Sequence, residues 1–195
     1  MRGFSVRILA AVAIAFTTHA AQPPEPAWFV PWKVLNPGDA PPHAQLVVYW
    51  LPASRDDMRH SELLTSRTLT LYSSQCVAMH VVRPDDFERI ANLGANGRAP
   101  LVLLLDGDGR EVTHIDSEAG ALRIATVERI LRDQVRVRED EADKQLDVAH
   151  AKCEAGEKNA AIAMYRRVFD QRCLLPRQAR TAQRALRKLG VDVSD

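Results

Sequence analysis

The stretch that decides the fold is QLVVYWLPASRDDM, residues 45–58. Its first seven residues form a short apolar run that contains two adjacent valines and an aromatic pair and is bounded by prolines. Such a run predicts a buried strand. Ser54 then stands where a helix N-cap is expected, and Asp56 and Asp57 place negative charge in the first turn, where the helix dipole favours it. The stretch therefore predicts a strand followed by a helix that reaches about residue 65.

Downstream of this unit the sequence predicts three more strands: residues 76–82, 101–105 and 111–115. The first of them is followed by DDFERIANLG, residues 85–94, a short helix that one of its leading aspartates caps and Gly94 ends. The other two flank an Asp-Gly turn, which is a strong hairpin signal. Residues 66–75 (SRTLTLYSSQ) fit either a strand, because the leucines alternate, or an extension of the first helix.

The C-terminal part is expected to be helical. Residues 121–155 contain no glycine or proline, and apolar residues recur every three or four positions at both ends. This pattern predicts one long helix or two helices with a soft break. The middle, RVREDEADK, is charged nearly all round and is expected to form a solvated bridge. Gly156 breaks the pattern, and two further helices follow, separated by Pro176.

The N-terminus has the pattern of a secretory signal peptide over residues 1–20. Arg2 and Arg7 precede the apolar run ILAAVAIAF, residues 8–16, and small residues surround a cleavage point after Ala20. The run is too short to span a bilayer as a helix, although an uncleaved anchor is the alternative. Cleavage changes the formal charge from +1 to −1, which gives no argument for nucleic acid. We therefore expect a periplasmic or secreted protein without an integral membrane span.

Residues 21–43 form a proline-rich arm. Seven prolines remove hydrogen-bond donors and restrict the backbone, so the arm is expected to be extended rather than helical. It also carries Trp28, Phe29 and Trp32. Because large aromatic surfaces gain from burial, these side chains are expected to dock on the domain, with peptide binding by the arm as the alternative.

The order of elements over residues 45–135 resembles the core of the thioredoxin superfamily, strand-helix-strand-helix-strand-strand-helix. Two local features add to the resemblance. Ala99-Pro100 stands directly before the first hairpin strand, where that family keeps a cis-proline facing its active site. The interval from Ser54 to Pro100 is close to the family's interval between its first redox cysteine and that proline. The resemblance implies a thioredoxin-like α/β domain over residues 44–136.

The redox motif of that family is missing from this chain. Its Trp-Cys-x-x-Cys sequence falls on residues 53–57, so that Ser54 takes the nucleophile position and Asp57 the resolving position. Thiol–disulfide exchange needs a thiolate and a second thiol, and neither a hydroxyl nor a carboxylate replaces them. What the resemblance leaves is a surface that holds an extended peptide by backbone hydrogen bonds. The residues expected to form this surface are Ser54, Arg55, Asp56, Asp57, Ala99 and Pro100.

The tail over residues 137–195 resembles a tetratricopeptide repeat. Five residues stand at the spacing of that motif: Ala149, Gly156, Ala161, Tyr165 and Val168. The large residues early in the motif's first helix are missing, and Pro176 arrives a few residues late. Stacked repeats bury their faces against neighbours, so the tail is expected to lean on the domain, on the long helix or on another chain. The helical face around Tyr165 is thus a second candidate binding surface, and the tail is a candidate for forming a homo-oligomer.

An odd number of cysteines in an exported protein raises the question of pairing. Cys76 begins an apolar strand and is interpreted as a small core residue; the alternative is a single reactive thiol, which would make the chain a redox enzyme or sensor. Cys153 and Cys173 lie three and seventeen residues from Gly156. At about 1.5 Å per residue, this mismatch separates them by about 20 Å along an antiparallel hairpin. A disulfide needs Cα atoms within about 7 Å, so we do not expect these two to pair. Cys173 is a candidate for pairing with another chain, and a disulfide from Cys76 to the tail is a further alternative.

No sequence motif for a cofactor is present. The chain lacks a phosphate loop, a dinucleotide fingerprint and a serine-hydrolase elbow, and no two histidines have helical metal-ligand spacing. We therefore predict no cofactor and no metal, with a zinc or copper site built from Cys76, His80 and a distant histidine as the alternative. Two aspartates in the 106–109 turn lack the further acids of a calcium loop.

Charge is segregated along the tail. Residues 158–188 contain nine basic residues and one acid, whereas residues 138–147 contain five acids and two basic residues. These faces are expected to attract each other within the tail or between chains; a basic face for an acidic partner or an anionic membrane is the alternative. The sequence as a whole predicts a protein- or peptide-binding module rather than an enzyme.

Overall fold

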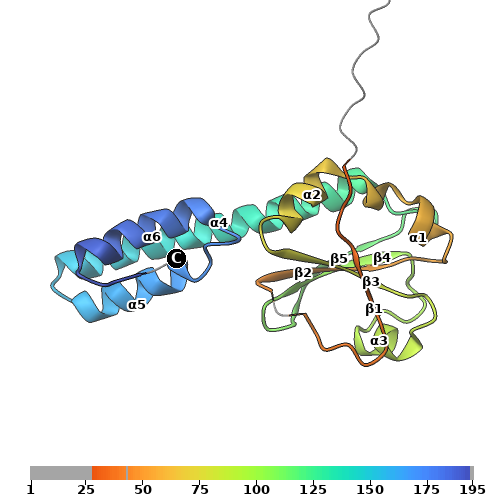
Figure 1. Ribbon diagram of the computed structural model, residues 1–195, viewed down its shortest axis with the longest axis horizontal. Helices are drawn as coiled ribbons and strands as arrows, with labels where there is room; N and C mark the ends of the chain where they lie inside the picture. Colours follow the sequence, from red (N-terminus) through yellow and green to blue (C-terminus); the bar gives the residue numbers. More distant parts are fainter. Residues whose placement is uncertain (1–27, 43, 194–195) are drawn as a thin grey trace, which may run out of the picture.

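A five-stranded mixed sheet lies at one end of the molecule, and a bundle of helices lies at the other (Figure 1). The computed structural model describes residues 28–42 and 44–193. The expected signal peptide and the first part of the proline-rich arm lie outside these residues. The chain is thus a mixed α/β structure that continues into a C-terminal helical region.

The sheet runs in the order β1-β3-β2-β4-β5. Its strands are β1 (Lys33–Leu35), β2 (Leu46–Leu51), β3 (Val77–Val82), β4 (Leu101–Asp106) and β5 (Glu111–Asp116). Strands β1 and β2 pair in parallel with β3, whereas β4 runs antiparallel to both β2 and β5. Every residue of β2 is buried, as expected for a central strand covered on both faces. The four predicted strands are confirmed, and β1 is an additional edge strand from the arm.

The arm docks on the sheet through Trp32 rather than through all its aromatic residues. The indole Nε1 of Trp32 donates to the carbonyl oxygen of Leu63 at 2.8 Å, and its ring centroid lies 5.5 Å from that of Trp50. Phe29, in contrast, is 69% exposed. Trp28 is half-buried, with the guanidinium carbon of Arg67 5.3 Å from its ring centroid. The expectation of docking is therefore confirmed for Trp28 and Trp32 and wrong for Phe29.

The helix predicted to follow β2 is broken into short pieces. It consists of α1 (Asp57–His60), a 3-10 helix (Glu62–Leu64) and α2 (Arg67–Ser73). Ser61 and Ser66 both have extended backbones, and each hydroxyl oxygen accepts a hydrogen bond from a backbone N–H of the helix that follows. Such caps favour a new helix start over continuation of the old helix. The prediction of a single helix to about residue 65 is thus wrong, and the ambiguous stretch 66–75 is helical.

Helices cover both faces of the sheet (Figure 1). On one face, Trp50 and Leu104 belong to a large buried cluster that includes residues of α2 and of the long helix α4 (Ile124–Glu154). On the other face, a smaller cluster of strand residues packs against the short helix α3 (Phe87–Asn92). The helix predicted over residues 85–94 is confirmed, and Asp86 caps it by accepting from the N–H of Arg89.

His80 of β3 is buried without a partner for one ring nitrogen. Among the described residues nothing bonds its Nδ1, and the ring lies against Tyr49, 5.8 Å between centroids. Burial, aided by the positive charges of Lys33 and Arg89, lowers the pKa of His80. The folded protein therefore keeps His80 neutral at pH values where the unfolded chain would protonate it. Its contribution to stability is complete above about pH 6.5 and is lost as the pH falls below that value.

We expect the urea midpoint of unfolding to decrease when the pH is lowered from about 7.5 to about 5.5. The decrease should be smaller in His80→Gln. Comparing the two slopes by circular dichroism separates the titration of His80 from the effect of the substitution itself. An identical pH slope in the two proteins would show that His80 titrates equally in the folded and unfolded states.

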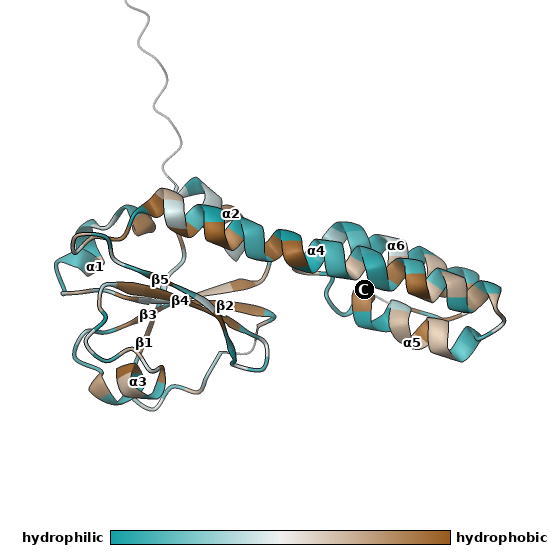
Figure 2. Cartoon of the chain, turned by 180° about the vertical axis from the view of Figure 1, so that it is seen from behind, coloured by the Kyte–Doolittle hydropathy of each residue, from teal (hydrophilic) through white to brown (hydrophobic). Residues whose placement is uncertain are grey.

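The C-terminal region is built on α4, which is one continuous helix of 31 residues. Its first part packs on the sheet, and its last part packs against α5 (Lys158–Phe169) and α6 (Pro176–Lys188) (Figures 1 and 2). The charged stretch in the middle is mostly exposed, as expected for a solvated bridge. Gly156 ends the helix with a positive φ of 84°, a conformation that side chains rarely adopt. Over residues 28–42 and 44–193, no helical segment combines the length and the apolar character that a transmembrane span requires.

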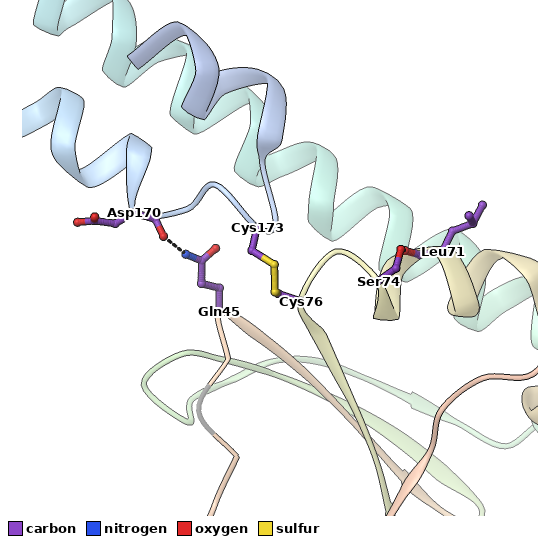
Figure 3. The surroundings of a disulfide bond; sticks show 6 residues. All are labelled: Gln45, Leu71, Ser74, Cys76, Asp170 and Cys173. Atoms are coloured by element: carbon purple, nitrogen blue, oxygen red, sulfur yellow. Dashed lines mark hydrogen bonds between the residues drawn. A yellow bond between two sulfur atoms is a disulfide. The ribbon is translucent and has the colours of Figure 1, made fainter. Parts of the chain in front are cut away.

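A disulfide between Cys76 and Cys173 ties the helical region to the sheet (Figure 3). It joins the residue that precedes β3 to the loop between α5 and α6, with 5.6 Å between the Cα atoms. Beside it, Nε2 of Gln45 donates to the carbonyl oxygen of Asp170 at 3.0 Å. The interpretation of Cys76 as a core residue is wrong, because Cys76 is exposed and its sulfur is bonded. The argument against a Cys153–Cys173 bridge is confirmed, since Cys153 is free.

Candidate functional site at the ends of β2 and β4

The two segments predicted to form the binding surface, residues 53–57 and Ala99-Pro100, lie at the same end of the sheet. Leu51, the last residue of β2, is paired with Leu101, the first residue of β4. Because these strands are antiparallel, the residues after Leu51 and the residues before Leu101 lie side by side. The peptide bond between Ala99 and Pro100 is cis, a point that the sequence left open. The structure thus brings the turn at residues 53–57 next to Ala99 and Pro100.

The turn between β2 and α1 is fixed by two reciprocal hydrogen bonds. The hydroxyl oxygen of Ser54 accepts from the N–H of Asp57, and Oδ2 of Asp57 accepts from the N–H of Ala53, both at 3.1 Å. Such an exchange satisfies N–H groups that a helix start leaves unpaired. The hydroxyl of Ser54 thus accepts a backbone hydrogen bond, but the N-cap of α1 is Asp56, two residues later, so the prediction of Ser54 as the N-cap is wrong. Ser54 and Asp57 shape the turn that leads into the helix.

Arg55 connects this turn to the end of β3. Its Nη2 donates to Oδ2 of Asp85 at 2.7 Å, and Nε of Arg83 lies 3.3 Å from the other carboxylate oxygen. The hydrogen bond from Arg55 is the largest effect that lowers the pKa of Asp85. The pair is solvated, so it orients Arg55 more than it stabilises the fold. The sequence predicts Asp85 only as one of two possible helix caps, so its contact with Arg55 becomes visible only in the folded structure.

Ala99 is the part of the site with unused backbone groups. Pro100 is buried, whereas Ala99 is exposed. Neither the N–H nor the C=O of Ala99 bonds to any residue that the structure describes. A backbone donor and acceptor beside a strand end can pair with an extended segment of another chain.

Thiol chemistry is absent from this end of the sheet. Cys76 lies at the opposite end, because β2 and β3 are parallel and Val77 is paired with Leu46, the first residue of β2. Its sulfur is also bonded to Cys173. The alternative of a lone reactive thiol at Cys76 therefore does not hold for the oxidised chain. A metal site with Cys76 and His80 is not supported either, because the described residues contain no cluster of three or more metal-ligating side chains.

Tyr165, the predicted second binding residue, does not stand on an open helical face. Its side chain is only 4% exposed and faces the core between α4, α5 and α6. Burial raises the pKa of its hydroxyl. Tyr165 is accessible only at the base of a groove between α4 and α6, which the sequence pattern did not reveal.

In comparisons with known proteins, no family model matches the chain and no curated protein matches it.

Proposed function

We propose that this chain is an exported, redox-inactive thioredoxin-like protein that binds an extended peptide segment of a protein partner. The binding surface consists of Ser54, Arg55, Asp56, Asp57, Ala99 and Pro100. Support for the thioredoxin-like assignment comes from the parallel β2–β3 pair and the β4–β5 hairpin. Serine and aspartate at the positions of the redox cysteines favour binding over catalysis.

The observation that carries the peptide-binding proposal is the backbone of Ala99. It is exposed, and its N–H and C=O bond to no described residue. An extended peptide can use both groups, and the adjacent turn offers Arg55 and Asp56 for contacts with its side chains. Because each backbone hydrogen bond contributes about 1 kcal/mol, two such bonds alone give weak binding, and the partner's side chains would supply the rest.

The proposal of export rests on the N-terminal pattern and on the disulfide. Cys76 and Cys173 are paired in the structure, and disulfides persist in oxidising compartments such as the periplasm and the extracellular space. Residues 1–20 supply a signal-peptide pattern in the sequence.

Peptide binding can be tested with a displayed random-peptide library and the mature protein. We expect peptides of micromolar affinity whose binding falls by about tenfold or more in Ala99→Trp, because the large side chain covers the backbone groups. Asn96→Trp is the matched control, since Asn96 is exposed in the same loop. Fluorescence anisotropy of the selected peptides measures both variants. Equal affinities for the two variants, or no selected peptide at all, would contradict the proposal.

A further inference from the structure

The helical region contains a groove between α4 and α6 that the proposed function does not use. Its volume is about 640 Å³. Leu146 and Cys153 of α4, Tyr165 of α5, and Ala185 and Leu189 at the end of α6 form its apolar floor. All five are buried or half-buried, so the floor is continuous with the core of the helical region. We call this feature the tail groove.

The two walls of the tail groove carry opposite charges. The α4 wall carries Asp147 and Glu154, with His150 between them. The α6 wall carries Arg184, Arg187 and Lys188. Within the described ranges, no ion pair involves Asp147, Arg187 or Lys188. The carboxylate and the two cations are exposed, and their charges are available to another molecule.

We propose that the tail groove is the interface of a homodimer in which the α4 wall of each copy faces the α6 wall of the other. A two-fold axis that runs along the groove exchanges the two walls, because rotation about that axis turns the left side of one copy toward the right side of its partner. Acidic side chains then oppose basic ones along both edges, and the two apolar floors face each other.

A second copy fits this surface better than a partner of uniform charge. An acidic peptide would be attracted by the α6 wall and repelled by the α4 wall, and a basic peptide would meet the reverse. Only a partner with both charges in the reversed order matches both walls, and a second copy presents that order by symmetry. This inference is independent of the proposed peptide site, which lies in the sheet region.

Cys153 supplies a direct probe of the interface. Of the three cysteines in the sequence, all in the described part of the chain, Cys153 is the one without a disulfide, and it lies on the floor of the tail groove. The proposed two-fold axis places the Cys153 thiols of the two copies in the same interface, close to each other. A short bismaleimide should therefore link two copies of the oxidised protein, and Cys153→Ser should abolish the link.

The decisive experiment reverses the charge of one wall at a time in the full-length mature protein. Asp147→Lys with Glu154→Lys makes the α4 wall basic like the α6 wall, and Arg187→Glu with Lys188→Glu makes the α6 wall net acidic like the α4 wall. We expect wild-type protein to sediment as a dimer at micromolar concentration and each double variant to weaken dimerisation about tenfold or more, because like charges then face each other. Circular dichroism verifies that the variants fold.

Mixing the two double variants gives the sharpest prediction. Each basic wall then meets an acidic wall, so the mixture should form heterodimers although neither variant dimerises well alone. Native mass spectrometry distinguishes the heterodimer by its mass. Three results would each overturn the proposal: a monomeric wild-type protein, a dimer whose stability does not change with the charge reversals, or a mixture that stays monomeric. If the tail groove binds a different macromolecule instead of a second copy, the purified wild-type protein should be monomeric.

Discussion

Removal of the Cys76–Cys173 disulfide is expected to lower the free energy of unfolding by about 3–4 kcal/mol. The two cysteines are 97 residues apart in sequence, so the bond closes a long loop in the unfolded chain. Closing a loop of about 100 residues removes enough chain entropy to account for up to about 4.7 kcal/mol, and measured effects are usually smaller. The contribution acts mainly by restricting the unfolded state.

The matched comparison is Cys76→Ala with Cys173→Ala against Cys153→Ala. Urea unfolding followed by circular dichroism should place the first variant far below wild type and the second close to it, because Cys153 is half-buried and unpaired. A loss under about 1 kcal/mol in the double variant would mean that the loop is already restrained in the unfolded state. Hydrogen exchange adds a local readout, since the loop that holds Asp170 should lose protection together with the Gln45 contact.

The disulfide also shows where sequence reasoning reached its limit. Cys76 was interpreted from its neighbours as a buried strand residue, but it precedes β3 and adopts a positive φ of 58° outside the strand. The distance between Cys76 and Cys173 depends on how the long helix carries the α5–α6 loop back to the sheet. No local pattern encodes that path, so the pairing could not be derived from spacing.

Local chemistry, in contrast, allowed the strands and the hydrogen bond of Ser54 to be predicted. Residues 46–51 carry only aliphatic and aromatic side chains because β2 is central in the sheet, and burial on both faces leaves a clear signal. The edge strand β1 was missed because it is only three residues long and lies within a proline-rich segment. Ser61 and Ser66 are the local signal for the helix breaks, because a serine that can cap favours a new helix start.

The sequence predicts which segments form the candidate site but not the contacts that its residues make. Ser54 and Ala99 are 45 residues apart in sequence, and their proximity follows from the pairing of Leu51 with Leu101. That register could be expected once a hairpin and a central strand were assigned. The unused backbone groups of Ala99 and the Arg55–Asp85 pair depend on exact loop paths, which composition does not determine.

The second large effect concerns α4, which passes from the sheet to the helical region. Leu131 is 0% exposed and belongs to the same buried cluster as Trp50 and Leu104. Leu131→Ala removes that packing and leaves a cavity, so we expect the free energy of unfolding to fall by about 3 kcal/mol or more. Val137 lies on the same helix, is 59% exposed and provides the matched control.

Val137→Ala should change stability by less than about 0.5 kcal/mol, and in the stabilising direction, because alanine favours helix and an exposed valine loses little packing. Urea unfolding of both variants compares the loss of unfolding free energy at a buried position with the loss at an exposed position of the same helix. Losses of similar size would mean that the middle of α4 is covered in solution. A loss under about 1 kcal/mol at Leu131 would mean that α4 is not seated on the sheet, because a filled core site cannot lose its side chain at so small a cost.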